Sequence, residues 1–218
     1  MLVAVSIAPL LAACFFRFAI PYIERLLCGY FGKASILAGY YLLFDMFLSL
    51  ITPYMFCFAS AMVMLTEYDE NMTNYIAVTP IGKSGYLISR LAFPAAISFL
   101  ASVVIMLLFT LTVWSFYMII ITCLLTCALS IAVSLFIFIF SHNRVEGMAM
   151  AKLSGLIMLG LPMPFFITSN VQYLFSILPS FWIAKLCIDR YYLFLLPAIL
   201  ITALWVYILF KKFSIKLA

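Results

Sequence analysis

The chain has 218 residues, of which 68% are hydrophobic and only 9% are charged, and its formal net charge is +5. Soluble domains carry about 25% charged residues, so this composition excludes a water-soluble globular protein and indicates a polytopic integral membrane protein. The basic residues are scattered along the chain rather than gathered into a patch, so nucleic acid is not an expected partner.

The apolar stretches predict an all-α fold with six transmembrane helices in a single domain over residues 1–218. Each span needs about 20 mostly apolar residues. The stretch Leu91–Asn143 contains no Asp, Glu, Lys or Arg and would extend about 80 Å as one helix, so it must turn once, near Trp114. A transmembrane β-barrel would need alternating polar positions, which the sequence lacks. The predicted spans are 2–23, 38–65, 86–111, 117–140, 148–168 and 191–210.

The first two spans each contain one ionisable residue, Arg17 and Asp45. Residues 1–20 have the character of a span rather than of a cleavable signal peptide. An unpaired charge at the bilayer centre costs about 3 kcal/mol on insertion scales. Because both residues lie at similar depth, an Arg17–Asp45 ion pair is one expectation. A role in a substrate path and snorkelling of either side chain to the interface are the alternatives.

A polar island, Thr66–Arg90, separates the second and third spans, and most of it forms a loop over 66–85. Its acidic residues would favour the start of a short helix, which Pro80 would end. Such a helix suits docking into a groove of a partner protein, and the alternative is a helix lying on lipid headgroups. The acidic residues are Glu67, Asp69 and Glu70, and the apolar edge of the helix would be Met72, Tyr75 and Ile76.

Within this loop, the segment 77–84 resembles a relaxed phosphate-binding loop. Pro80 removes one amide donor and no strand precedes the segment, so we expect no ATP site and no cofactor in this chain. His142 is the only histidine, in a second polar loop with Arg144 and Glu146, which argues against a bound metal ion and against a zinc enzyme. The sequence therefore predicts no catalytic residues.

The connection 169–190 is too apolar for a water-exposed loop, yet Pro179 argues against a full span. A re-entrant helical hairpin fits this composition, and an amphipathic helix at the interface is the alternative. The same connection contains Trp182, Lys185 and Cys187. A disulfide between Cys187 and Cys28 is left open.

The distribution of Lys and Arg near the span ends favours cytoplasmic termini. In that orientation seven basic residues lie inside (Lys83, Arg90, Arg144, Lys152, Lys211, Lys212 and Lys216) and four lie outside (Arg25, Lys33, Lys185 and Arg190). The loop 66–85 would then face the cytoplasm, and the hairpin 169–190 would face outward.

Four groups of residues resemble ATP-binding-cassette export permeases of type 2, and within that class the fluoroquinolone-export permease group. The similarity spans nearly the whole chain. In chain order, the motifs are Pro9, Arg17-Phe18 and Pro21; Glu67-Tyr-Asp-Glu70, Val78-Thr79-Pro80-Ile81, Tyr86-Leu87 and Arg90; Asn143–Met148 and Lys152; and Leu178-Pro179-Ser-Phe-Trp182 with Lys185.

This resemblance implies a bacterial cell membrane protein whose two permease subunits, identical or sister chains, enclose a path for amphipathic drugs or other hydrophobic small molecules. It implies a coupling helix at about Glu67–Thr79 that docks onto a separately encoded ATPase, which holds the ATP and magnesium. The implied coupling residues are Glu67, Asp69, Glu70, Tyr75, Ile76, Thr79, Pro80 and Lys83.

Two features depart from the family. Asn71-Met72-Thr73 stands where members commonly have Gly-Thr, and the first predicted span begins at residue 2, where members usually have a preceding elbow helix. The rival readings are an ion-coupled carrier or channel without an ATPase, and an intramembrane enzyme. A carrier would normally have several intramembrane ionisable residues, whereas only Arg17 and Asp45 qualify here.

Overall fold

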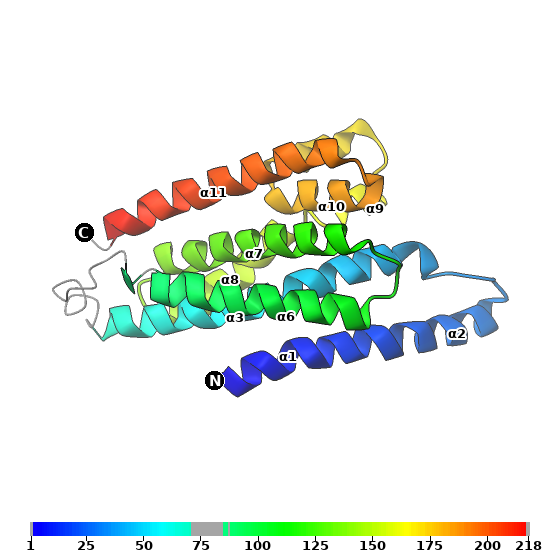
Figure 1. Ribbon diagram of the computed structural model, residues 1–218, viewed down its shortest axis with the longest axis horizontal. Coiled ribbons are helices and arrows are strands. Elements are labelled where there is room, and N and C mark those ends of the chain that lie inside the picture. The colour runs from blue at the N-terminus through cyan, green and yellow to red at the C-terminus, as the bar shows by residue number, and fades with distance from the viewer. Residues whose placement is uncertain (1, 71–84, 87, 217–218) are drawn as a thin grey trace.

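The computed structural model describes residues 2–70, 85–86 and 88–216, leaving aside the side chains of residues 2–6. All the secondary structure in these ranges is helical, and six helical stretches are long and apolar enough to cross a membrane, which confirms the predicted fold class. The helices run roughly parallel to one long axis (Figure 1). The chain therefore belongs to the multi-pass membrane proteins.

The first span consists of α1 (Leu2–Cys14), a π-helical turn (Phe15–Ala19) and α2 (Ile20–Phe31), and it is longer than predicted. The second is a 3₁₀ turn (Ala38–Tyr40) with α3 (Tyr41–Asp69). The third is a π-helical turn (Ile88–Ala92) with α6 (Phe93–Phe109), and the fourth is α7 (Phe116–Ile139), so the turn near Trp114 is confirmed.

The fifth span is α8 (Arg144–Met158) followed by the short α9 (Met163–Phe166), and the sixth is a 3₁₀ turn (Tyr192–Phe194) with α11 (Leu195–Lys216). The hairpin region contains a 3₁₀ helix (Asn170–Ile177) and α10 (Pro179–Asp189). The predicted fifth span, 148–168, is broken at residues 159–162, where Gly160 and Pro162 interrupt the helical backbone.

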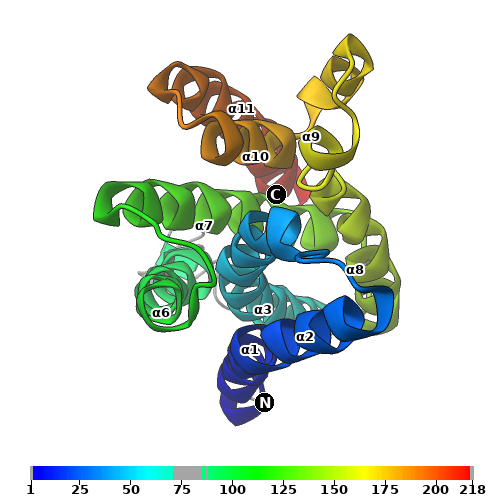
Figure 2. The same cartoon turned by 90° about the vertical axis from the view of Figure 1, so that its right-hand side faces the viewer.

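Helices α3 and α7 form the centre of the bundle, and the other spans surround them (Figure 2). Small polar side chains join α3 to its neighbours: the hydroxyls of Ser102 in α6 and Thr126 in α7 both donate to the Ser49 carbonyl, at 3.1 and 3.2 Å. Close packing of small and hydroxylated residues is a main source of helix association in lipid, where the hydrophobic effect between helices is lost.

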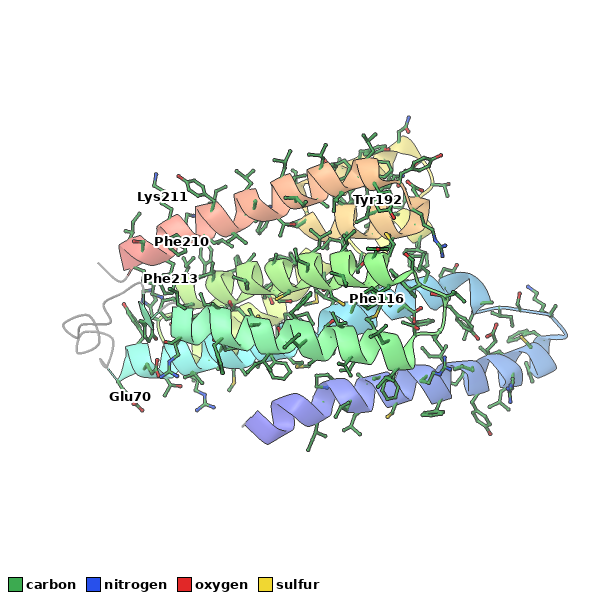
Figure 3. All side chains as sticks on the ribbon, in the orientation of Figure 1. Glu70, Phe116, Tyr192, Phe210, Lys211 and Phe213 are labelled. Atoms are coloured by element: carbon green, nitrogen blue, oxygen red, sulfur yellow. The ribbon has the colours of Figure 1, made fainter. Side chains whose placement is uncertain are left out.

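The C-terminal residue of α11 holds three helix ends together. The ammonium of Lys216 donates to the carbonyls of Phe138 at 2.6 Å, Ile139 at 3.3 Å and Ser141, which satisfies carbonyls that the end of α7 leaves unpaired. It also lies 4.9 Å from the ring centre of Tyr68 in α3. We call this the C-terminal end of the bundle; Glu70, Lys211 and Phe213 mark it in Figure 3, while Phe116 and Tyr192 lie toward the opposite end.

Candidate functional site

A cluster at the C-terminal end joins the last turn of α3 to the start of the third span. The Glu67 carboxylate forms an ion pair with the Arg90 guanidinium and accepts a second bond from Arg90 Nε at 3.2 Å. It also accepts a bond from the Tyr86 hydroxyl at 2.9 Å. The Glu67 side chain is only 13% exposed, so these bonds stabilise a carboxylate that is largely removed from water.

The Glu67 cluster (Glu67, Tyr86 and Arg90) brackets the predicted coupling segment in the sequence. Burial and the hydrogen bond to Glu67 raise the pKa of Tyr86, so its phenol remains a neutral donor at physiological pH. Tyr75, Ile76, Thr79, Pro80 and Lys83 lie outside the described residues. The cluster nevertheless holds together the two ends of this loop, which are the last turn of α3 and the start of the third span.

The prediction that Glu67, Asp69 and Glu70 begin a short helix is wrong for Glu67 and Asp69, which lie in the last turn of α3. The helix dipole disfavours acids there. The Arg90 bonds offset this for Glu67, while Asp69 and Glu70 are exposed to solvent. The helix continues to Asp69 because Tyr68 packs edge-to-face on Phe138 of α7, with ring centres 5.7 Å apart.

The second polar loop caps α8. The Asn143 side chain accepts the Glu146 backbone N–H at 2.9 Å, and the Glu146 carboxylate accepts the His142 N–H at 2.7 Å. Asn143 is thus the N-cap of α8, and Glu146 in the first turn bonds back to the residue before the cap. Arg144 is the first residue of α8 and is exposed, and Glu146 follows it in the first turn, where a negative charge favours the helix.

At the opposite end, Asp45 is 1% exposed and organises the turn between α6 and α7. Its carboxylate accepts the backbone N–H groups of Leu111 at 2.8 Å and Thr112 at 2.9 Å, the Thr112 hydroxyl, and the Trp114 indole N–H at 3.0 Å. Four donors therefore converge on one buried carboxylate.

The predicted Arg17–Asp45 ion pair is not formed among the described residues. The Arg17 guanidinium instead donates to the Thr110 carbonyl at 2.5 Å, one residue before the turn that Asp45 holds. Both charges bind the same connection, and the sequence could not show this because the turn offers backbone donors that satisfy Asp45 without a cation.

The segment 169–190 has the form of a helical hairpin with its bend at Leu178-Pro179. The Trp205 indole donates to the Ile177 carbonyl at 3.1 Å, and Trp205 lies about 15 Å along α11 from its first residue, Leu195. The bend therefore reaches well into the bundle, and most of α10 is buried. This depth favours the predicted re-entrant hairpin over a helix lying flat on the surface.

Other contacts fix α10 in this position. Trp182 donates to the Ser176 carbonyl at 2.7 Å across the bend, and the Ser180 hydroxyl donates to the Ile157 carbonyl of α8. Lys185 forms an ion pair with Asp189 at 3.4 Å. Cys187 is buried beside Thr122, with its sulfur 3.5 Å from the hydroxyl.

The break in the fifth span packs directly against this hairpin. A Cβ added at Gly160 would lie 2.7 Å from the Phe181 backbone nitrogen and against the Ser180 hydroxyl, whereas one added at Gly155 in α8 would meet nothing within 4 Å. We expect Gly160→Ala to lower the midpoint of thermal unfolding in detergent, because the backbone at Phe181 would have to shift to make room for the added methyl group. Gly155→Ala is the matched control and should be neutral or slightly stabilising, since Ala favours helix over Gly by about 1 kcal/mol. Equal effects of both would contradict this packing.

The surface of α8 carries an exposed cation. Lys152 lies about 12 Å along the helix from Arg144, and no ion pair or hydrogen bond of its ammonium occurs within the described part of the chain. Exposed apolar residues flank it, among them Met148 and Leu156. A lysine this far inside a span is costly against lipid, so this face is a candidate for contact with water or with another subunit.

Comparison with known proteins gives the same family as the sequence motifs. Residues 1–210 match the family model described as "Fluoroquinolones export permease protein Rv2686c-like". The fluoroquinolones export permease proteins Rv2686c (strain H37Rv) and MT2760 (strain CDC 1551 / Oshkosh) of Mycobacterium tuberculosis are each 41% identical to this chain over 46 residues. The aligned stretch covers 21% of this chain and 18% of each relative. No solved structure matches. Because the family model covers nearly the whole chain, this protein belongs to the Rv2686c-like family of fluoroquinolone export permease proteins.

Proposed function

We propose that the chain is the membrane subunit of an ATP-driven ABC exporter in the bacterial cytoplasmic membrane, with both termini in the cytoplasm. A separate subunit binds and hydrolyses ATP with magnesium. The observation that carries this proposal is the Glu67 cluster, which fastens both sides of the 66–85 loop to membrane-spanning helices. A loop fixed in this way can pass a mechanical push to the bundle.

Helix α3 provides the route for that push. Glu67 and Asp45 lie about 33 Å apart along one continuous helix, which matches the roughly 30 Å hydrocarbon thickness of a bilayer. A displacement at Glu67 would therefore move the α6–α7 turn that Asp45 holds on the other side. Rigid helices joined at both membrane surfaces suit a rocking motion that alternates access between the two sides.

The path itself would form between two such subunits, identical or sister chains. The exposed Lys152 on α8 supports this assembly, because a second subunit or a water-filled path beside it would remove the cost of placing its charge in lipid. The names of the relatives give fluoroquinolones as their exported compounds. We extend this here to amphipathic drugs or other hydrophobic small molecules.

The proposal is tested by measuring efflux of a fluorescent fluoroquinolone from cells that carry the permease with its ATPase. Depleting ATP while a proton gradient is maintained should abolish efflux, and collapsing the proton gradient while ATP is maintained should leave most of it. The reverse pattern, or efflux that persists after the ATPase gene is deleted, would show an ion-coupled carrier and overturn the proposal.

A further inference from the structure

A cleft of about 440 Å³ lies between α1, α3 and α6, which are neighbours in Figure 2. Its walls include Pro9 and Leu10 of α1, Phe56 of α3, and Leu100 and Val104 of α6. Thr52 is the one polar residue of the lining, and its hydroxyl is already bonded to the Leu48 carbonyl at 3.5 Å. The cleft therefore offers apolar contact at the level of the spans, in the volume range of roughly 300–1,000 Å³ that small-molecule sites occupy.

A cation stands beyond one end of this cleft. Arg17 follows Leu10 by about two helical turns, and its guanidinium reaches across to the Thr110 carbonyl at the end of α6. Thr110 caps the end of α6 and lies about 9 Å along the helix axis beyond Val104, one of the α6 residues that line the cleft. The side chain of Arg17 is exposed, and its bond to Thr110 is the one hydrogen bond it makes among the described residues.

A guanidinium carries five N–H donors in a planar fork that matches a phosphate, so Arg17 retains donors for an anionic ligand. An apolar cleft within the spans and a cation about 10 Å closer to the membrane surface have the layout of a phospholipid, with acyl chains below an anionic headgroup. A drug with a carboxylate could use both the cleft and the cation, so the charge alone does not select the occupant. The walls of the cleft lie on the outside of the bundle, with Leu10 48%, Leu100 64% and Val104 53% exposed, so lipid of the surrounding bilayer reaches them directly. This exposure favours a lipid.

We propose that α1, α3 and α6 form a binding site for one anionic phospholipid, with an acyl chain in the cleft and the phosphate on Arg17. Bound there, the lipid would fill the gap between α1 and the rest of the bundle. Its phosphate would also accept a second hydrogen bond from Arg17, which already bonds to the Thr110 carbonyl at the start of the α6–α7 turn.

The site is tested by native mass spectrometry of the detergent-purified transporter after incubation with dioleoyl phosphatidylglycerol or dioleoyl phosphatidylcholine. We expect one tightly retained phosphatidylglycerol per chain and about tenfold weaker retention of phosphatidylcholine. Arg17→Gln should weaken retention of phosphatidylglycerol about tenfold, the size expected from losing one charge-assisted contact, and Arg17→Lys should weaken it less. Ala101→Phe, which places a ring in the cleft, should lower retention of both lipids.

Two matched variants provide controls. Arg25→Gln removes an exposed arginine from α2, and Leu107→Phe adds a ring to an exposed position of α6 that does not line the cleft. Both should retain phosphatidylglycerol as the unchanged protein does. Equal loss in Arg17→Gln and Arg25→Gln, or equal retention of the two lipids, would indicate only general membrane contact and would overturn the proposal. Loss of bound phosphatidylglycerol when a fluoroquinolone is added in excess would assign the cleft to the drug instead and would also overturn the proposal.

Discussion

Replacing Asp45 with Ala is expected to be the most destabilising single change in the bundle. It would leave the half-buried N–H groups of Leu111, Thr112 and Trp114 without the buried carboxylate that accepts them. Each buried donor left unpaired costs roughly 1–3 kcal/mol, so the total is on the order of 4 kcal/mol. In a domain of this size this corresponds to a fall of about 10 °C in the midpoint of thermal unfolding, which can be measured in detergent by the loss of monodisperse protein.

Asp189→Ala is the control for this prediction. Asp189 also lies at the opposite end of the bundle, but its ion pair with Lys185 is partly exposed, so its removal should cost no more than about 1 kcal/mol. Asp45→Asn should fall between the two, because the amide keeps one acceptor oxygen and places a donor against donors. A loss of stability in Asp45→Ala no greater than that in Asp189→Ala would show that the turn does not depend on this carboxylate.

Replacing Arg90 with Ala is expected to uncouple the transporter. The change removes both Arg90 bonds to Glu67 and leaves the Tyr86 bond as the remaining side-chain contact of the cluster, so movement of the 66–85 loop would displace the two helices together less effectively. We expect substrate-stimulated ATP turnover of the purified complex to fall at least tenfold, equivalent to about 1.4 kcal/mol in the activation barrier. The complex itself should still assemble, because Arg90 lies outside the segment that we propose docks onto the ATPase.

Two further variants separate coupling from general damage. Arg144→Ala removes an exposed arginine at the same end of the bundle and should leave turnover near that of the unchanged complex. The charge exchange Glu67→Arg with Arg90→Glu should restore part of the turnover that either single change removes, as expected for residues coupled in a double-mutant cycle. Full turnover in Arg90→Ala would rule out the Glu67 cluster as the connection.

Hydropathy and span length were sufficient to predict the six spans, because an uncharged stretch such as Leu91–Asn143 must be helical and must turn. The break at Gly160 was missed because the mean hydropathy of a span of about 20 residues does not change when four of them, 159–162, are non-helical. The end of α3 was misplaced by a turn because an acidic run predicts a helix start only when no partner such as Arg90 compensates it.

The residues of the site were easier to predict than their partners. The sequence singled out Arg17 and Asp45 as charges within the first two spans and Glu67 as an acid of the polar island, but their partners come from segments far apart in the chain. Trp114 is 69 residues from Asp45, and Arg90 is 23 residues from Glu67. Matching acids and arginines that face the same membrane surface would have suggested the Glu67–Arg90 pair. It could not have suggested backbone donors for Asp45.

The central claim, that this permease works with a separate ATPase through the 66–85 loop, is tested most directly by purifying the tagged chain from its native host in mild detergent. Mass spectrometry would then identify and quantify the proteins that accompany it. We expect a cassette ATPase in near-stoichiometric amount, lost in Tyr75→Asp and retained in Arg90→Ala, since the first alters the docking segment and the second alters only its connection to the bundle. A chain that arrives alone, or with an ATPase that Tyr75→Asp does not release, would contradict the claim.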